Sequence, residues 1–361
     1  MEDRQRSIPR KHLAVWVPLV LLLGLGGGVV WQWQSLETRN RQASQQRFQL
    51  QAEDIGQRVL SRMRAYEMVL RGISGLMIGS EQVSLQEWDR AVEQLRLQDR
   101  YPGIMALGWA RHVEQDRLDD FLSQVQADGR MDYRAFPPGP RDEYVLIDYI
   151  SPFDWRNRRA LGYDMLSEPT RRAAIELALG SGDVTLSAQL VLRQETEADA
   201  QGGVLLYLPV FRPGMPLSNV EERRAALFGF VYGAFRIKEL MAGILGAQNR
   251  LFDIALTDQQ AGGSLVPGSN DGQPGAFEQP FRQTMALDLY GRTWLLDVAG
   301  TAQYATTAGS QGMTFSLWMG LAATGLLALL VGGYLYQRER ELYASRVTTE
   351  QLSERDRKSV V

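Results

Sequence analysis

An uncharged stretch of 21 residues, from Ser316 to Tyr336, constrains this chain more than any other feature. At about 1.5 Å per helical residue it extends roughly 30 Å, the thickness of the hydrocarbon core of a bilayer. Two arginines follow within residues 337 to 341, whereas residues 293 to 315 contain neither Lys nor Arg. The positive-inside rule therefore predicts a membrane-spanning helix with a cytoplasmic tail. The alternative is a buried core helix, although such helices seldom lack polar residues over this length.

A second uncharged run, from Leu13 to Trp31, follows a segment with four basic residues. It also predicts a span, and a cleaved signal peptide is the competing interpretation. Its 19 apolar residues exceed a usual signal-peptide core, and no Ala-x-Ala-like site follows before Gln32. Gly24 and Gly28 have the spacing that lets two such helices approach closely, although a Gly-rich span can contain it by coincidence. Both ends of the chain are then cytoplasmic, and residues 32 to 315 form one extracytoplasmic loop.

Composition excludes several classes of protein. The chain has no cysteine and two histidines, so it cannot form disulfides or a histidine-rich metal site. The 39 basic residues are balanced by 42 acidic ones, which gives no electrostatic signature of nucleic-acid binding. No Walker-type loop and no Gly-x-Ser-x-Gly motif occurs. We therefore expect no nucleic-acid partner, no metal or other cofactor, and no catalytic residues.

A helical stripe follows the first span. Its spacings alternate between three and four residues, which is typical of an amphipathic helix. This stalk helix can pack on the domain behind it or on a second copy of itself. We expect the first contact for its C-terminal half and the second for its membrane-proximal half, so that residues 42 to 310 form a weak dimer that depends on Ile55. The stripe consists of Phe48, Ala52, Ile55, Val59, Met63, Tyr66, Leu70 and Ile73.

The remainder of the loop predicts an α+β fold with two small antiparallel sheets. A helix at 85 to 97 begins with a capping box, Ser84 with Glu87. An exposed loop is expected at 262 to 275, which is rich in Gly, Pro, Ser and Asn. Further helices are expected at 116 to 127, 169 to 179 and 237 to 245. Strands are expected at 103 to 110, 144 to 150, 184 to 192, 203 to 211, 227 to 235, 251 to 258, 285 to 290 and 293 to 298.

Several short motifs together resemble the CHASE family of extracytoplasmic sensor domains. The resemblance covers residues 69 to 245, and the block from Asn157 to Arg172 is its most specific part. The motifs are Tyr101-Pro-Gly-Ile104, Gly108-Trp-Ala110, Arg141-Asp-Glu-Tyr144, Asn157-Arg-Arg-Ala-Leu-Gly-Tyr-Asp164, Ser167-Glu-Pro169 with Arg171-Arg172, and Gly229-Phe-Val-Tyr232.

The resemblance implies a stalk helix, a membrane-distal PAS-like sheet that holds a small ligand, a membrane-proximal PAS-like sheet and a homodimer. It also implies a cytoplasmic output module, such as a histidine kinase or a cyclic-di-nucleotide enzyme. Only 25 residues follow the second span, and they contain no motif of such a module. We therefore expect either a truncated receptor or an output in a partner protein. The expected segments are 1–12, cytoplasmic; 13–31, transmembrane; 32–80, stalk; 81–235, distal subdomain; 236–312, proximal subdomain; 313–336, transmembrane; and 337–361, cytoplasmic signalling helix.

The family's plant-cytokinin ligands do not suit this chain. In members that bind cytokinin, an Asp shortly after Asp-Met-Leu-Ser accepts the adenine hydrogen bonds, and a Thr on a later strand also contributes to ligand binding. In this chain Thr170 and Arg171 stand at the position of that Asp. Tyr207 stands at the position of that Thr. An arginine matches a carboxylate or phosphate better than an adenine edge. Arg171 at a helix N-terminus therefore predicts a small ligand with an acidic group. The candidate ligand-binding residues are Arg171, Asp164, Tyr149, Ser187, Tyr207, Asn157 and Arg159; the alternative is that the loop residues among them make structural hydrogen bonds.

Three functions remain open at this stage. The first is the ligand-binding module of a two-pass receptor in the bacterial inner membrane, with its sensor domain in the periplasm and no enzyme activity in this chain. The second is the membrane-anchored part of a signalling enzyme, a diguanylate cyclase, phosphodiesterase or histidine kinase. The third is a passive membrane anchor for a partner complex.

Overall fold

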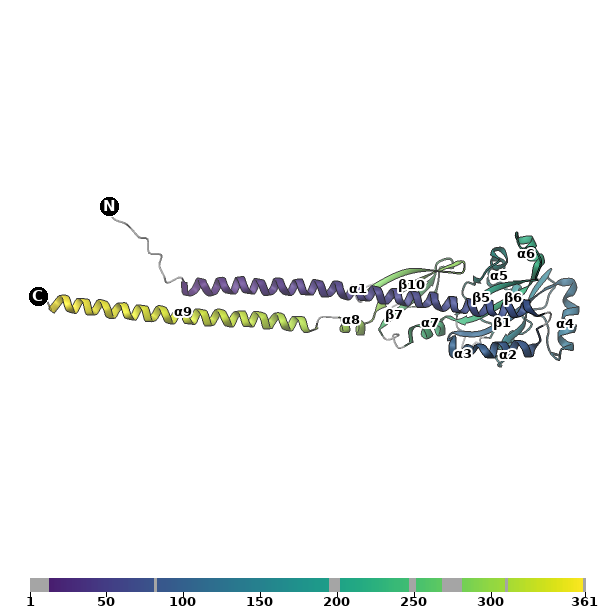
Figure 1. Cartoon of the computed structure of the whole chain (residues 1–361), viewed down its shortest axis with the longest axis horizontal. Coiled ribbons are helices and arrows are strands. Elements are labelled where there is room, and N and C mark those ends of the chain that lie inside the picture. The colour runs from purple at the N-terminus through teal and green to yellow at the C-terminus, as the bar shows by residue number, and fades with distance from the viewer. Residues whose placement is uncertain are drawn as a thin grey trace. The chain divides into compact units, whose positions relative to one another are not determined.

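The computed structural model describes residues 13–80, 83–194, 202–246, 251–267, 281–308 and 311–359. The chain divides into two compact units, one from Phe48 to Tyr304 and one that joins Met1–Arg47 to Ala305–Val361. The first unit combines helices with two antiparallel sheets (Figure 1). This confirms the α+β class and the long N-terminal helix.

Helix α1 (Leu13–Gly79) is continuous through the predicted span and the stalk. All eight residues of the predicted stripe are at most 4% exposed, and they pack within the first unit. Ile55 is 1% exposed. The expectation that part of the stripe remains for a second copy is therefore wrong, because the chain's own domain covers the whole stripe. A homodimer stays a prediction without an assigned contact.

The larger sheet has the strand order β2-β1-β6-β5-β3, with β4 also paired to β5. All its pairings are antiparallel. The long central strands are almost entirely buried, which fits a sheet covered on both faces. The strands are β1 (Ile104–Glu114), β2 (Glu143–Ser151), β3 (Thr185–Leu186), β4 (Leu190–Val191), β5 (Gly202–Phe211) and β6 (Leu227–Arg236).

Different helices cover the two faces of this sheet. On one face Tyr66 of α1 packs on Phe235 at 4.6 Å between ring centroids, and Trp88 of α2 packs on Tyr149 at 5.6 Å. On the other face α5 and the chain before it close the main apolar core. The short elements here are α2 (Leu85–Leu95), α3 (Leu97–Arg100), η2 (Gln115–Arg117), α4 (Leu118–Ala127), η3 (Asn157–Ala160), η4 (Met165–Ser167), α5 (Pro169–Ser181) and α6 (Val220–Ala226).

The segment from Val184 to Leu192, expected to be one strand, forms two short strands instead. Ser187 interrupts the ladder because its hydroxyl accepts a hydrogen bond from the backbone N–H of Leu205 at 2.9 Å and donates to the carbonyl of Ala188 at 2.8 Å. The Ser187 side chain thus accepts a hydrogen bond from β5 that a backbone carbonyl would accept in a regular strand. The predicted position in the sheet is correct, whereas the predicted continuity is wrong.

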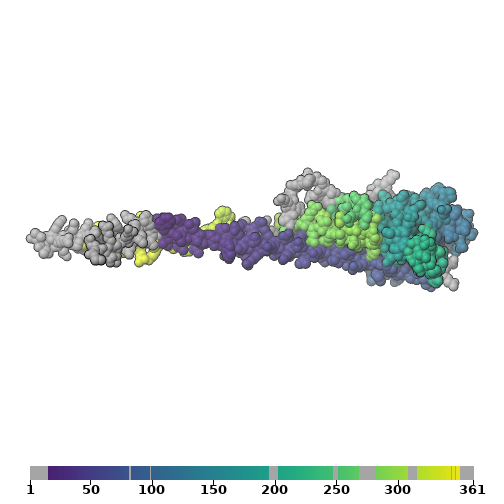
Figure 2. All heavy atoms as spheres, turned by 90° about the horizontal axis from the view of Figure 1, so that it is seen from above, coloured from purple at the N-terminus to yellow at the C-terminus, as the bar shows by residue number. Residues whose placement is uncertain are grey.

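The smaller sheet has the strand order β8-β7-β10-β9. Strand β8 was missed, because it lies inside the stretch expected to be a loop; residues 268–280 of that stretch lie outside the described residues. The tip of the β9–β10 hairpin reaches the larger sheet and the stalk: Leu186 N–H donates to the Tyr290 carbonyl at 3.0 Å, and the Tyr290 hydroxyl donates to Glu67 at 2.9 Å. Figure 2 shows the stalk part of α1 along both sheets. The elements are α7 (Ile237–Leu245), β7 (Phe252–Asp258), β8 (Gly263–Val266), β9 (Arg282–Leu289), β10 (Arg292–Gly300) and α8 (Ala302–Ala308).

The second unit contains the start of α1 and all of α9 (Gln311–Ser359). By length and composition, the helical stretches Val15–Gly79 and Phe315–Thr349 are long and apolar enough to cross a membrane. They cover all but the first two residues of each segment predicted to span, 13–31 and 313–336. The bilayer itself stays a prediction.

Candidate functional site

The loop between β2 and α5 is held by its own polar residues. Asp164 is fully buried and accepts hydrogen bonds from the backbone N–H groups of Val145 and Leu166, both at 3.0 Å. Arg141 lies 3.3 Å from the other carboxylate oxygen. Burial raises the pKa of Asp164, and these two amides and Arg141 oppose that rise. The carboxylate therefore fastens the loop to β2 and caps η4.

Glu168 begins α5 and positions Arg171. Its carboxylate accepts from the N–H groups of Thr170 and Arg171, both at 3.0 Å, and lies 3.2 Å from the Arg171 guanidinium. Partial burial acts to raise the pKa of Glu168, but the two amides and the Arg171 charge outweigh it and hold the pKa below its usual range. Arg171 is 4% exposed and also donates to the Val191 carbonyl at 2.9 Å. It thus connects the start of α5 to β4.

A cavity of about 430 Å³ opens beside this connection. Its walls come from the η3 loop, the first turn of α5 and the segment that contains β4. The size suits a small organic molecule. The lining residues are Arg159, Tyr163, Glu168, Thr170, Arg171, Leu190, Val191, Leu192 and Arg193.

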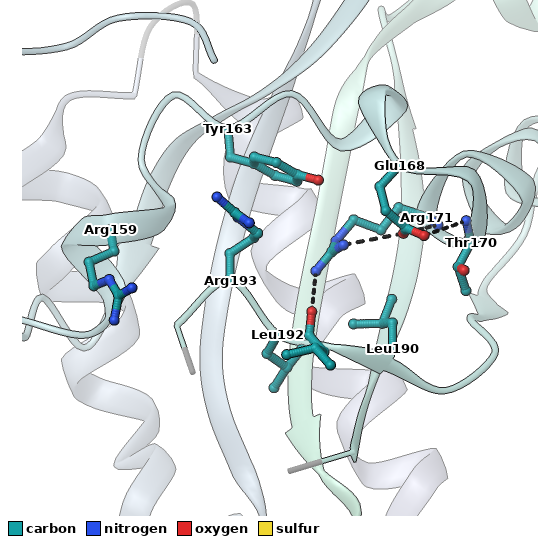
Figure 3. A pocket seen from close by; sticks show the side chains of 9 residues that line it. Arg159, Tyr163, Glu168, Thr170, Arg171, Leu190, Leu192 and Arg193 are labelled. Carbon is teal, nitrogen blue, oxygen red and sulfur yellow. Dashed lines mark hydrogen bonds and ion pairs between the residues drawn. The ribbon is translucent and has the colours of Figure 1, made fainter. Parts of the chain in front are cut away.

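Three arginines and one glutamate make this cavity electropositive. Figure 3 shows Arg193 beside the Tyr163 ring, Arg171 between Glu168 and β4, and Arg159 on the far side. The guanidinium carbons of Arg193 and Arg171 lie 4.8 and 5.3 Å from the centre of the Tyr163 ring. Among the described residues neither Arg159 nor Arg193 has a carboxylate partner. The two charges are thus available to an anion.

A second cavity, of about 300 Å³, lies between β2, α5 and α6. Here three of the basic residues, His112, Arg141 and Arg224, pair with carboxylates of the protein itself, and Arg172 donates to the Leu166 carbonyl. His112 lies 2.8 Å from Glu143, which also pairs with Arg224. Arg141 pairs with Asp164. The first cavity is therefore the better candidate for an anionic ligand.

The predicted site residues do not all meet in one place. Arg171 and Arg159 line the first cavity, as do their neighbours on the same loop and helix. Asp164 and Asn157 instead hold the loop, since Asn157 donates to the Pro152 carbonyl at 2.7 Å. Ser187 bonds to the backbone of β5. For Asp164 and Asn157 the geometry corresponds to the structural alternative, and Ser187 does not line the cavity.

Tyr149 faces away from the cavity. The register between β1 and β2 shifts between Trp109 and Ala110, so Trp109 pairs with Tyr149 while Ala110 pairs with Ile147. A bulge of this kind inserts one residue and reverses the alternation beyond it. The Tyr149 hydroxyl consequently donates to the Val83 carbonyl at 2.8 Å, on the face covered by α1 and α2. Tyr149, named above as a candidate ligand-binding residue, therefore does not line the cavity.

Tyr207 does lie on the predicted face, within the core beneath α5. It is fully buried, and its hydroxyl has no hydrogen-bond partner among the described residues. Burial raises its pKa far above the usual value, and the nearby charge of Arg171 opposes that rise. Tyr207 therefore lies near the cavity without lining it.

Of the nine lining residues, only Arg159 and Arg171 were among the predicted site residues. Tyr163 and Arg193 are the aromatic and the cationic residue that were missed. Tyr163 belongs to the motif that ends at Asp164. Arg193 follows a short apolar segment and has no motif of its own. The signal that could have identified Arg193 is a basic residue just after a short strand that lies beside the N-terminus of a helix.

Comparison with protein families gives a match over the sensor part of the chain. The model described as "CHASE domain" matches residues 81–266, slightly more than half of the chain. The matched residues contain every residue that lines the first cavity. No curated protein matches the sequence.

Solved structures of chemoreceptor domains resemble the fold weakly. One is the ligand-binding domain of the Pseudomonas aeruginosa PAO1 amino acid chemoreceptor PctC in complex with GABA, with 12% identity, a TM-score of 0.43, and 70% of this chain and 98% of that chain covered. Another is the periplasmic sensory domain of the Campylobacter jejuni chemoreceptor Tlp1, with 9% identity, a TM-score of 0.41, and 77% and 99% covered.

Proposed function

Because this chain belongs to the CHASE domain family, we propose that it is the sensor module of a two-pass transmembrane receptor and that its ligand is a small organic anion. The module binds its ligand outside the cytoplasm and performs no chemistry itself. Signal passes through the helix at Ser316 to Tyr336 to a cytoplasmic output.

One observation carries the choice of ligand. Arg159 and Arg193 line the same cavity without a carboxylate partner among the described residues, next to the ion pair of the buried Arg171 with the partly exposed Glu168. A guanidinium matches the planar geometry of a carboxylate and binds it through charge-assisted hydrogen bonds. Tyr163 holds the Arg193 group over its ring and so limits its conformations. The arrangement favours an anion over a neutral or cationic ligand.

The roles of the arginines differ. Arg171 joins α5 to β4 through Glu168 and the Val191 carbonyl, so it forms the wall and sets the width of the cavity. Arg193 and Arg159 supply the charge that meets the ligand. This assignment modifies the sequence-based hypothesis, in which Arg171 alone holds the acidic group.

The test is a binding screen on the full chain in lipid nanodiscs. Thermal unfolding is followed with monocarboxylates, dicarboxylates and phosphate esters, and affinities are then measured by calorimetry. Loss of one charge-assisted hydrogen bond costs about 1.5–3 kcal/mol, so Arg193→Gln should weaken binding by roughly ten- to a hundredfold. Arg171→Ala should instead lower the free energy of unfolding.

Arg90→Gln serves as the matched control, because Arg90 is an exposed cation on α2, on the other side of the larger sheet. It should leave the affinity unchanged. If Arg193→Gln and Arg159→Gln both bind the anion as tightly as the unmodified chain, the cavity is not the ligand site.

A further inference from the structure

Two tyrosine hydroxyls lie buried without a partner on the same face of the larger sheet. Tyr207 on β5 and Tyr232 on β6 are cross-strand neighbours, with ring centroids 6.3 Å apart. Both side chains are 0% exposed. Neither hydroxyl has a hydrogen-bond partner among the residues that the structure describes.

Such hydroxyls work against the stability of the free protein. A buried polar group that has lost water without gaining a partner costs free energy of folding, and a Phe of nearly the same shape would avoid this cost. The sheet nevertheless makes room for one of them: a Cβ at Gly108 would overlap with the Tyr232 ring, so glycine at this strand position is what admits it. Two adjacent hydroxyls of this kind indicate a role other than packing in the apolar core.

Their position points to the cavity. Tyr163, Leu190 and Leu192 line the cavity and belong to the same apolar core cluster as both tyrosines. Burial raises the pKa of both tyrosines, and the positive charge of Arg171 opposes that rise. The inner wall of the cavity and the two tyrosines are thus parts of one core.

The other unpartnered atoms differ in chemistry or in setting. Asn157 Oδ1 and Asp164 Oδ2 are acceptors in the loop before α5, and Asp164 Oδ2 lies 3.3 Å from Arg141. Trp109 shares β1 with Ala110 but faces the opposite side of the sheet, where it packs on Phe228 at 5.1 Å. Gln283 and Trp294 belong to the smaller sheet. Of the unpartnered hydroxyls found in the described chain, both therefore occur behind the arginine-lined cavity.

We propose that Tyr207 and Tyr232 form a second polar subsite, which donates hydrogen bonds to an acceptor at the inner end of the ligand. The ligand class is then an organic anion with two functional ends: an acidic group at Arg193 and Arg159, and a carbonyl, ether or second carboxylate oxygen at the tyrosines. Binding moves Arg171 aside enough to connect the cavity to the sheet face. This inference rests on the proposed function, because it assumes that the anion binds in this cavity.

The test uses paired probes on the full chain in nanodiscs. Levulinate carries a keto oxygen that pentanoate lacks, and the pair is repeated with one and two more methylene groups to vary the reach. The keto acid of the fitting length should bind about two- to tenfold more tightly than its alkanoate, which is the effect of one neutral hydrogen bond. Tyr207→Phe and Tyr232→Phe should abolish that advantage and leave alkanoate binding unchanged.

The same variants should also raise the unfolding temperature of the ligand-free chain, because each removes an unpartnered hydroxyl without changing the packing. Tyr133→Phe is the control: its buried hydroxyl donates to the Ile147 carbonyl at 3.0 Å, so its loss should lower the unfolding temperature and leave the probe preference intact. A gain in stability together with a loss of selectivity cannot arise from a merely structural tyrosine.

The outcomes separate this inference from the proposed function. If Arg193→Gln weakens all the acids but no keto acid is preferred, the anion site stands and the tyrosine subsite is refuted. The subsite is also refuted if the Phe variants unfold at a lower temperature. If the unmodified chain binds neither series, both proposals fail.

Discussion

The guanidinium of Arg171 makes two contacts within the protein, an ion pair with Glu168 and a hydrogen bond to the Val191 carbonyl. Five N–H donors in a planar fork leave it further capacity, but any large movement breaks a bond between α5 and β4. A ligand that draws on Arg171 therefore also shifts β4. In the proposed function, Arg193 and Arg159 recognise the ligand, and the neighbouring Arg171 transmits its presence.

Glu168 makes the stability of the contact between α5 and β4 depend on pH. Its folded-state pKa is lowered, because the amides of Thr170 and Arg171 and the Arg171 charge together outweigh its partial burial. A carboxyl with a lowered folded-state pKa contributes stability above its unfolded value of 4.5, and that stability is lost as the pH falls through the folded value. Glu168→Gln should consequently flatten the fall of unfolding temperature between about pH 6 and pH 3.

The control for this prediction is Glu176→Gln, an exposed position on the same helix. Its acid profile should follow that of the unmodified chain. Equal acid profiles for Glu168→Gln and the unmodified chain would show that the capping carboxylate contributes no pH-dependent stability.

Residue-level roles were only partly accessible from the sequence. Two candidate residues from the block between Asn157 and Arg172, Arg159 and Arg171, line the cavity. Tyr149 was misplaced because a bulge depends on how two distant strands pair, which no pattern within one strand reveals. Arg193 was missed because its proximity to Arg171 arises only when β4 pairs with β5.

At the scale of elements, the stalk half of α1 is part of the domain's core. The stripe alternates between three and four residues, and that pattern predicted the helix correctly. The same pattern fits a coiled coil equally well, so the sequence left the partner of the stripe undecided. The two sheets decide it, because they bury every residue of the stripe.

Ile55 provides the test of this packing. Because its side chain is 1% exposed within its own domain, Ile55→Ala should lower the free energy of unfolding by about 2–5 kcal/mol, measured by denaturant titration of the full chain. Leu50→Ala, on an exposed part of the same helix with a 65% exposed side chain, should change it by less than about 0.5 kcal/mol. Similar small effects for both variants would mean that the stripe is not buried in solution.

The proposed sensor function requires the ligand-binding domain and the C-terminal tail to lie on opposite sides of a membrane. Length, charge and hydropathy allowed the sequence to predict both spans, because a bilayer requires about 20 apolar residues whatever the fold. They could not predict the contacts among the sheets, since those depend on long-range pairing. The helices of the structure contain both predicted spans, which is a statement about length and composition.

Reporter fusions test the arrangement directly. Alkaline phosphatase needs disulfides and is active only outside the cytoplasm, whereas green fluorescent protein fused through the same linker reports the cytoplasmic side. A fusion after Tyr304, the last residue of the first unit, should give phosphatase activity and no fluorescence. A fusion after Leu352, within α9 and beyond the second span, should give the opposite result, because the arginines at 338 and 340 stay in the cytoplasm.

An N-terminal epitope tag retained on the mature chain would exclude cleavage of the first span as a signal peptide. Phosphatase activity at both junctions would place the cavity and the C-terminal helix on the same side, and the proposed route of signalling would then be impossible.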